Sequence, residues 1–152
     1  MEQMDKIIEN LSDLEVYSLT VIGEARGEPI EGQVAVASNI KNRIHNNPSR
    51  YKSYKDVCLE RLQYSCWNEN DPNRAYLLGL GSKMLLNQRD FDSYIRQCIY
   101  VTIGVDNGSI IDNTHGAIYY MTKKLFNSMD RPSWSKDAKN TVGKGNQIFF
   151  NL

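Results

Sequence analysis

The stretch Gly23-Glu24-Ala25-Arg26-Gly27-Glu28-Pro29 joins two segments with helical hydrophobic spacing and determines where the first of them ends. Glycine interrupts a helix, and the residue before a proline avoids the helical region. We therefore expect Glu24 to lie in the last turns of a buried helix. A carboxyl group at the edge of an apolar wall loses solvation of its charged form, which suits a catalytic acid. Acids near a helix end are also common as ordinary solvated residues, and both interpretations of Glu24 stay open at this point.

The helices on either side are predicted from caps and spacing. Residues 12–15, Ser-Asp-Leu-Glu, have the form of a capping box, in which the serine and the glutamate satisfy free backbone donors. Apolar residues between positions 11 and 22 are dense enough to predict burial on more than one side. Pro29 can open a second helix, with apolar residues at helical spacing as far as position 44, that stops before Pro48. Arg43 near its end is typical of a surface arginine, or of one that grips a carboxylate in the site.

Later segments predict more helices and then a small β element. Asp71-Pro72 is typical of a helix start, and residues 91–102 repeat apolar side chains at helical spacing. Toward the C-terminus two short β-favouring runs occur near glycines, so we expect strands there. Residues 132–134 and 136–145 indicate a turn-rich connection. We predict a mainly helical α+β fold with a small β element, and the expected strands are residues 117–121 and 147–150.

Size and charge limit the classes of function. A chain of 152 residues with 41% hydrophobic content can bury a core of its own, and no linker or repeat divides residues 1–152 into two domains. The formal net charge is zero, which argues against nucleic acid as a partner because phosphate binding favours a basic face. The first 31 residues nevertheless carry eight acids and two bases, and the last 31 carry six bases and two acids. This asymmetry can orient the chain toward an anionic polymer, or simply pair opposite charges across the fold.

Cysteine, histidine and hydropathy patterns argue against several other classes. Cys58, Cys66 and Cys98 are odd in number and lack metal-ligand spacing, so we expect reduced thiols in a reducing compartment. Two histidines, His45 and His115, do not form the paired ligands of a helical zinc motif. No apolar run has the length of a membrane span, and the polar, acidic N-terminus is unlike a signal peptide. We therefore expect no metal, no cofactor, no membrane partner and no signal peptide.

Four blocks of the sequence resemble one known family. Residues 23–29 and 31–37, followed by Asn42-Arg43, are similar to the core of the spore cortex-lytic enzyme family, the SleB/CwlJ type of cell-wall hydrolase. The likeness covers nearly the whole chain from about Leu14, and it implies a lysozyme-like, lytic-transglycosylase-like single domain. The three later blocks are Gln63-Tyr64-Ser65-Cys66-Trp67-Asn68, Asp112-Asn113-Thr114-His115-Gly116-Ala117-Ile118-Tyr119-Tyr120 and Gly145-Asn146-Gln147-Ile148-Phe149.

The resemblance implies cleavage of peptidoglycan glycan strands between N-acetylmuramic acid and N-acetylglucosamine. Glu24 stands at the position that matches the family's acid. In a lytic transglycosylase this acid protonates the bond oxygen and then acts as base while the muramyl 6-hydroxyl closes a 1,6-anhydro ring. The alternative is a hydrolytic muramidase; a two-carboxylate glycosidase uses a second carboxylate as nucleophile or base, and Glu28 and Glu31 are the nearby candidates for that role. On a continuing helix Glu24 and Glu28 would stand side by side, an arrangement that flanks a bond poorly.

The predicted substrate-binding residues are Gln63, Ser65 and Trp67 in the second block and Tyr119 and Tyr120 in the first expected strand. Amides and hydroxyls pair with sugar substituents, and aromatic faces cover the C–H side of a pyranose. By residue type alone Trp67 fits a core anchor under a loop equally well, and the resemblance favours the cleft. Successive strand residues point to opposite faces, so one tyrosine can face substrate while the other packs inward.

Departures from the family pattern and two rival functions limit the transfer. Asn113 stands where the family usually has proline, and Gln147 stands where histidine is frequent. One rival is a thiol peptidase or amidase that uses Cys66 with His115; the other is a noncatalytic glycan-binding or virion structural protein. We expect a monomer that binds peptidoglycan. A leaderless single-domain member of such a family is typical of a phage product, kept in the host cytoplasm until lysis or carried in a virion.

Overall fold

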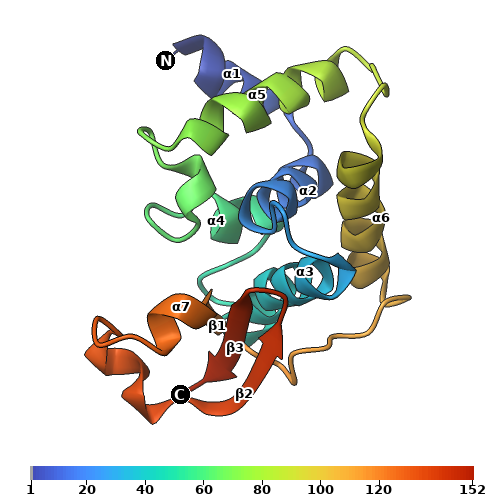
Figure 1. The fold of residues 1–152 in the computed structure, drawn as a ribbon. Coiled ribbons are helices and arrows are strands. Elements are labelled where there is room, and N and C mark those ends of the chain that lie inside the picture. Colours follow the sequence, from blue (N-terminus) through green and yellow to red (C-terminus); the bar gives the residue numbers. More distant parts are fainter. Residues whose placement is uncertain (1) are drawn as a thin grey trace.

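The computed structural model describes residues 2–152, and Met1, the first residue of the predicted domain, lies outside them. It has a larger helical part and a small sheet at one end (Figure 1). No helix in this part of the chain is long and apolar enough to cross a membrane. In chain order the described elements, with η denoting a 3-10 helix, are α1 (Glu2–Asn10), α2 (Asp13–Glu24), α3 (Ile30–Asn46), α4 (Tyr54–Cys58), η1 (Ser65–Trp67), α5 (Pro72–Leu85), α6 (Ser93–Asn107), β1 (Tyr119–Thr122), α7 (Lys123–Phe126), η2 (Ser133–Asp137), β2 (Lys139–Lys144) and β3 (Gln147–Asn151).

Helix α2 lies in the middle of the helical part and contacts α3, α4, α5 and α6 (Figure 1). All of its side chains from Val16 to Ile22 are buried, which confirms the predicted burial on more than one side. The predicted capping box is present, because Ser12 Oγ accepts from the Glu15 N–H at 3.1 Å and Glu15 Oε1 accepts from the Ser12 N–H at 2.7 Å. The helix ends at Glu24, as expected from the glycines and the proline that follow.

Helix α3 packs against α2 and stops at Asn46, before Pro48, as predicted. Pro29 occupies the cap position just before the helix rather than its first turn, because its backbone is extended, with φ −66° and ψ 170°. The buried Tyr17 hydroxyl donates to the Ala37 carbonyl at 2.6 Å and links the two helices. The contacts between α2 and α3 thus help to hold α2, and with it Glu24 at the end of α2, in place.

The sheet has the order β1-β3-β2, and both neighbouring pairs are antiparallel. Strands β1 and β3 confirm the two predicted strands, with Tyr120 opposite Phe149. Strand β2 corrects the interpretation of residues 136–145 as a turn-rich connection. It is polar and mostly exposed, so it lacks the hydrophobic alternation by which strands are recognised. It forms because the turn at Gly145, where φ is 58°, folds it back onto β3.

The loop that leads into β1 is folded around Asp112 and bound to α3. The Asp112 carboxylate accepts hydrogen bonds from Thr114, from a backbone N–H and from the Asn42 side chain, at 2.6 to 2.9 Å. A second amide of α3, Asn39 Nδ2, donates to the Ala117 carbonyl at 3.3 Å. Burial by itself would raise the pKa of Asp112, but these hydrogen bonds outweigh burial and lower that pKa. Polar contacts with α3 thus position β1 beside the end of α2.

Candidate active site

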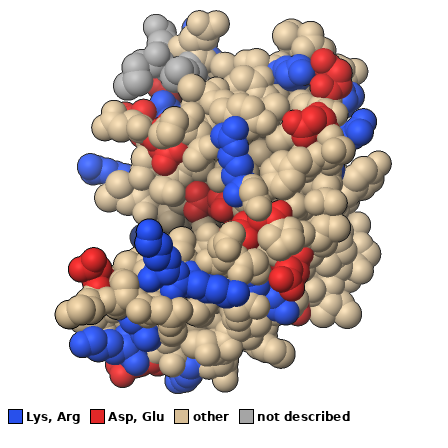
Figure 2. Space-filling model, viewed as in Figure 1, with Lys and Arg blue, Asp and Glu red and all other residues tan. Residues whose placement is uncertain are grey.

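A cleft of about 450 Å³ opens between the helical part and the sheet. Figure 2, in the view of Figure 1, shows acidic atoms in a recess near the middle of the visible face, with basic side chains above and below them. A larger apolar groove of about 550 Å³ lies along α2, α5 and α6, but it contains none of the predicted site residues. The residues that line the cleft are Glu24, Arg43, Leu62, Gln63, Ser65, Tyr119, Tyr120 and Trp134.

Three donors hold the Glu24 carboxyl group. Its Oε1 accepts from the Tyr120 hydroxyl at 2.5 Å, and its Oε2 accepts from the Cys66 N–H at 3.1 Å and from Ser65 Oγ at 3.5 Å. The donors come from β1 and η1, while Glu24 itself ends α2. These hydrogen bonds fix the orientation of the carboxyl group, and because Glu24 is half-buried in the cleft wall, part of it stays accessible from the cleft.

Gly23 explains how η1 comes so close to Glu24. A Cβ at position 23 would lie 2.7 Å from Cys66 Cβ and 2.9 Å from Leu77 Cδ1, distances that real side chains do not tolerate. Only glycine therefore allows Cys66 to pack directly on the last turn of α2. That close contact brings the Cys66 N–H within hydrogen-bond reach of Glu24. The glycine at position 23 is therefore needed for the hydrogen bond that holds the glutamate at position 24.

The two tyrosines of β1 lie on opposite faces of the sheet, as strand alternation predicts. Tyr119 stacks on Phe150 with ring centroids 5.8 Å apart, and Tyr120 stacks on Phe149 at 5.1 Å. Both nevertheless line the cleft, because β1 is an edge strand and the cleft runs alongside it. Burial, and then the negative charge of Glu24, raise the pKa of Tyr120 well above its ordinary value. Its phenol therefore keeps its proton and donates to Glu24.

The tryptophan in the cleft is not the predicted one. Trp67 packs against the core, and its indole N–H donates to Thr20 Oγ1 at 2.9 Å, so it anchors η1 and does not line the cleft. Trp134, in η2, lines the cleft instead, with its ring centroid 5.8 Å from that of Tyr119 and 52% of its surface exposed. An aromatic residue on a polar connection was the available signal for Trp134. Gln63 and Ser65 do line the cleft, and their part in binding a substrate stays a prediction.

The two candidates for a second carboxylate bind the β2–β3 turn. Glu28 is 7% exposed, and its Oε2 accepts from the Asn146 N–H at 2.9 Å. Glu31 Oε1 accepts from the Gly145 N–H at 3.4 Å. Neither lines the cleft, so Glu24 is the one carboxylate among its described lining residues.

The departures from the family pattern have different surroundings. Asn113 Nδ2 donates to the Glu31 carbonyl at 3.0 Å, a contact that a proline side chain could not make. Gln147 lies in β3, and its Oε1 is buried without a hydrogen-bond partner among residues 2–152. Asn113 thus supplies a local contact of its own, whereas nothing in the structure gives Gln147 a role.

The arrangement around Cys66 argues against a thiol nucleophile. Its side chain is 1% exposed beneath Gly23, and burial followed by the charge of Glu24 raises the pKa of its thiol. A reactive cysteine needs the opposite shift, toward the thiolate. His115 is exposed in the Asp112 loop, where its φ of 56° is adopted outside any helix or strand. Within the described residues, no group of three or more histidine, cysteine or acidic side chains could hold a metal ion.

Comparisons with known proteins agree on one class. The Cell Wall Hydrolase family matches residues 27–150. The chain is 44% identical over 54 residues to a spore cortex-lytic enzyme of Bacillus subtilis (strain 168), a match that covers 36% of this chain and 17% of that protein. It is 54% identical over 35 residues to a spore cortex-lytic enzyme of Oceanobacillus iheyensis, covering 23% of this chain and 13% of that protein. The matched regions thus span less than a fifth of these curated relatives.

Two solved structures resemble the whole domain. The catalytic domain of the Bacillus cereus SleB protein has a TM-score of 0.60 and 22% identity, and covers 91% of this chain and 89% of its own. The catalytic domain of the germination-specific lytic transglycosylase SleB from Bacillus anthracis has a TM-score of 0.61 and 23% identity, and covers 93% of this chain and 98% of its own. At these identities the likeness concerns the fold, and it confirms the predicted lysozyme-like, mainly helical α+β class.

Proposed function

Because this chain belongs to the Cell Wall Hydrolase family, we propose that it cleaves the glycan strands of peptidoglycan between N-acetylmuramic acid and N-acetylglucosamine, with Glu24 as the acid and base. The observation that carries the proposal is that the cleft offers one carboxylate and that this carboxylate is held in place. Among the described residues that line the cleft it is the one carboxylate, and three donors from two other elements hold it. A lone, oriented carboxyl group suits a reaction in which one group does both proton transfers.

The proposed reaction is that of a lytic transglycosylase. Glu24 gives its proton to the glycosidic oxygen, and the bond from that oxygen to muramyl C1 breaks. The Glu24 carboxylate then takes the proton of the muramyl 6-hydroxyl, whose oxygen bonds to C1 and closes the 1,6-anhydro ring. The acid is regenerated and no water is consumed. The substrate's own hydroxyl attacks from within the same sugar, which lowers the entropic cost of the second step.

The donors around Glu24 suit the charged state that follows the first proton transfer. After the first proton transfer the carboxylate carries a full negative charge, and fixed donors stabilise such a charge without reorganisation. The Tyr120 hydroxyl and the Cys66 N–H are already in place, at 2.5 Å and 3.1 Å. They come from β1 and η1 of the same chain, so the proposed site needs no residue from a second copy. We therefore propose that the single domain acts as a monomer, without a cofactor.

A hydrolytic muramidase is the second candidate, and the position of the other acids makes it the weaker one. Two-carboxylate glycosidases place their acids roughly 5 to 9 Å apart across the scissile bond. Glu28 and Glu31 are instead bound to the β2–β3 turn. A water molecule taking the place of the 6-hydroxyl would still give hydrolysis, so the two reactions are distinguished by their products.

The test is mass spectrometry of purified peptidoglycan digested with the wild-type chain and with Glu24→Gln. We expect anhydro-muramyl products from the wild type and a loss of at least about a thousandfold in the variant, because the amide cannot donate or accept the required proton. Glu69→Gln is the matched control, since Glu69 is an exposed acid in the turn after η1. Its activity should equal that of the wild type.

Other outcomes would assign other functions. Reducing-end muramic acid would indicate hydrolysis, and sacculi left intact by every variant would indicate a noncatalytic binding role. Cut peptide stems that persist in Glu24→Gln but disappear in Cys66→Ala would indicate the thiol peptidase. Equal activity of Glu24→Gln and wild type would contradict the assignment of Glu24.

A further inference from the structure

A single arginine shares the cleft with Glu24. Arg43 lies in the last turn of α3 and lines the same cleft as Glu24 at the end of α2. Its guanidinium carbon is 5.7 Å from the ring centroid of Tyr119 and 5.9 Å from that of Tyr64. Contact of a cation with two aromatic faces restricts the position of the guanidinium group. Arg43 is therefore a positioned positive charge in the proposed substrate site.

Arg43 forms no ion pair with a described side chain. No described carboxylate oxygen lies within the 4.0 Å of an ion pair, and the buried Nε has no hydrogen-bond partner among the described residues. A buried donor of a charged group that stays unpaired is costly. Arg43 lies near the C-terminus of the helix, as expected, but its half-buried side chain lines the cleft and forms no ion pair with a described carboxylate.

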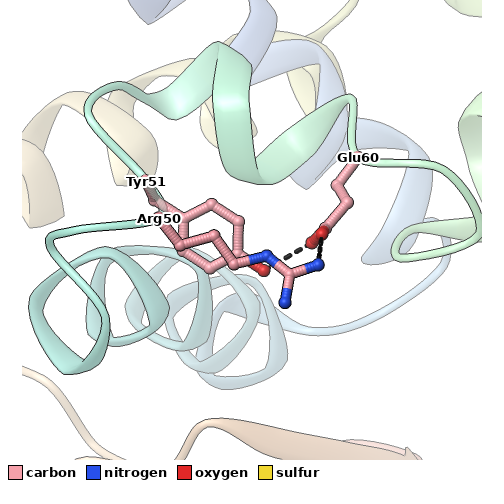
Figure 3. Close-up of polar contacts among 3 residues, drawn as sticks. All are labelled: Arg50, Tyr51 and Glu60. Carbon is pink, nitrogen blue, oxygen red and sulfur yellow. Dashed lines mark hydrogen bonds and ion pairs between the residues drawn. The ribbon is translucent and has the colours of Figure 1, made fainter.

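The nearby acid Glu60 is already taken. Figure 3 shows the side chains of Arg50 and Tyr51 reaching the carboxylate of Glu60, which both residues contact. The Tyr51 hydroxyl first, then Arg50, and to a smaller extent the charge of Arg43 lower the pKa of Glu60. This acid therefore carries its charge near neutral pH, and its direct contacts are with Arg50 and Tyr51. Arg50 thus has an ion pair in this region, whereas Arg43 in the cleft feels the charge of Glu60 without forming an ion pair with it.

We propose that Arg43 binds a carboxylate of the wall polymer and gives the cleft a preference for anionic over neutral glycan chains. The proposal rests on the proposed function, because it takes the cleft beside Glu24 to be the glycan site. A guanidinium group matches the planar carboxylate with two parallel hydrogen bonds. N-acetylmuramic acid ends its lactyl group in a carboxyl, whereas N-acetylglucosamine has none.

This difference between the two sugars has a consequence for which bond is cut. The two sugars alternate along the strand, so only every second sugar offers an acid near Arg43. Binding that acid would place the muramyl unit at a fixed distance from Glu24 and set the register of the strand. Arg43 is thus proposed as a specificity-determining residue, and Glu24 as the catalytic one. The carboxylate could belong to the lactyl group itself or to the peptide stem attached to it.

Three glycan preparations separate these sources. The first is stem-free strands with free lactyl carboxylates, the second is the same strands with those carboxyls coupled to methylamine, and the third is strands with intact peptide stems. Binding is measured by calorimetry at low salt in the Glu24→Gln background, where no strand is cut, and kcat/KM is measured in the otherwise wild-type chain. The variants are Arg43→Gln and Arg43→Lys, with Arg89→Gln, an exposed arginine outside the cleft, as control.

We expect the chain with Arg43 to bind free-carboxylate strands about tenfold more tightly than the methylamide strands. Arg43→Gln should lose this preference while keeping its affinity for the neutral strands, and Arg43→Lys should keep part of it. Raising the salt concentration should shrink the difference. A preference seen only with intact stems would assign the carboxylate to the peptide.

Two results would overturn the inference. One is an equal affinity of the Arg43 chain for all three preparations, and the other is an equal weakening of every preparation by Arg43→Gln, which would mark a structural role. Thermal unfolding of the variants checks that the fold is kept. Cleavage without any charge preference would remove this inference and leave the proposed function intact. A charge preference in binding without any cleavage would support this inference and contradict the proposed function.

Discussion

The two walls of the cleft are built by different kinds of contact. The helical wall, formed by the end of α2 and by η1, depends on apolar close packing of Cys66 and Leu77 around Gly23. The sheet wall, formed by β1 and the Asp112 loop, is bound to α3 by hydrogen bonds such as that from Asn42 to Asp112, residues 70 positions apart. The difference teaches that the helical wall depends on the shape of closely packed side chains, whereas the sheet wall depends on polar pairs and should weaken in acid.

The largest effect should come from a methyl group added to the helical wall. Gly23→Ala places a Cβ 2.7 Å from Cys66 Cβ, so η1 must move away from Glu24. We expect a loss of about 1–3 kcal/mol in the free energy of unfolding, from overpacking. Activity on peptidoglycan should fall by at least about tenfold, because the Cys66 N–H leaves Glu24. Urea unfolding measures the loss of stability, and the amount of soluble product formed from peptidoglycan measures the loss of activity.

Gly79→Ala is the matched control for this substitution. Gly79 lies inside α5, and a Cβ there meets nothing within 4 Å. Removing a helical glycine should raise the free energy of unfolding by about 0.5–1 kcal/mol and leave activity unchanged. If Gly23→Ala were as stable as wild type, the contrast between the two glycines, and with it the role of close packing, would be lost.

The next effect tests the sheet wall. Asp112→Asn removes the charge that accepts hydrogen bonds from Thr114, Asn42 and the backbone. Because Asp112 is partly exposed, we expect a loss of only about 1–2 kcal/mol in the free energy of unfolding at pH 7. Asp130→Asn, at an exposed aspartate, should change it by less than about 0.5 kcal/mol.

The same variant should show the predicted acid sensitivity of this wall. Hydrogen bonds lower the pKa of Asp112 in the folded chain below its unfolded value. Its stabilising contribution is therefore present above the unfolded pKa, about 4, and is lost as the pH falls through the folded pKa. Unfolding measured across that range should show the wild type and Asp112→Asn converging in acid. A difference that stays constant with pH would contradict the assignment.

The smallest effect on stability is expected where the walls meet. Tyr120→Phe removes the hydroxyl that joins β1 to Glu24 at 2.5 Å and keeps the ring stacked on Phe149. Activity should fall by about tenfold, while the free energy of unfolding changes by less than about 1 kcal/mol. Tyr100→Phe, at an exposed tyrosine outside the cleft, is the control and should keep the activity of the wild type. Equal activity of both variants would remove Tyr120 from the proposed site.

Local signals accounted for most of the helical wall. The capping box at Ser12, the dense apolar run of α2 and the break after Glu24 act within a few residues, and each was found where expected. The resemblance between family blocks also brought Glu24, Gln63 and Ser65 to attention before any geometry was known. What local patterns could not reveal was that the side chain of Trp67 turns inward to Thr20 while Trp134 takes a place in the cleft.

The amino-acid sequence by itself determined the helical frame, the two apolar strands and the position of Glu24 at a helix end, because periodicity and caps are local properties of the chain. Only the tertiary structure decided that Glu28 binds Asn146, 118 residues away, that β2 completes the sheet and that Arg43 enters the cleft without an ion pair to a described side chain. Polar partners distant in sequence carry no periodic signal. Their pairing depends on which backbone groups the fold brings together and leaves to be satisfied.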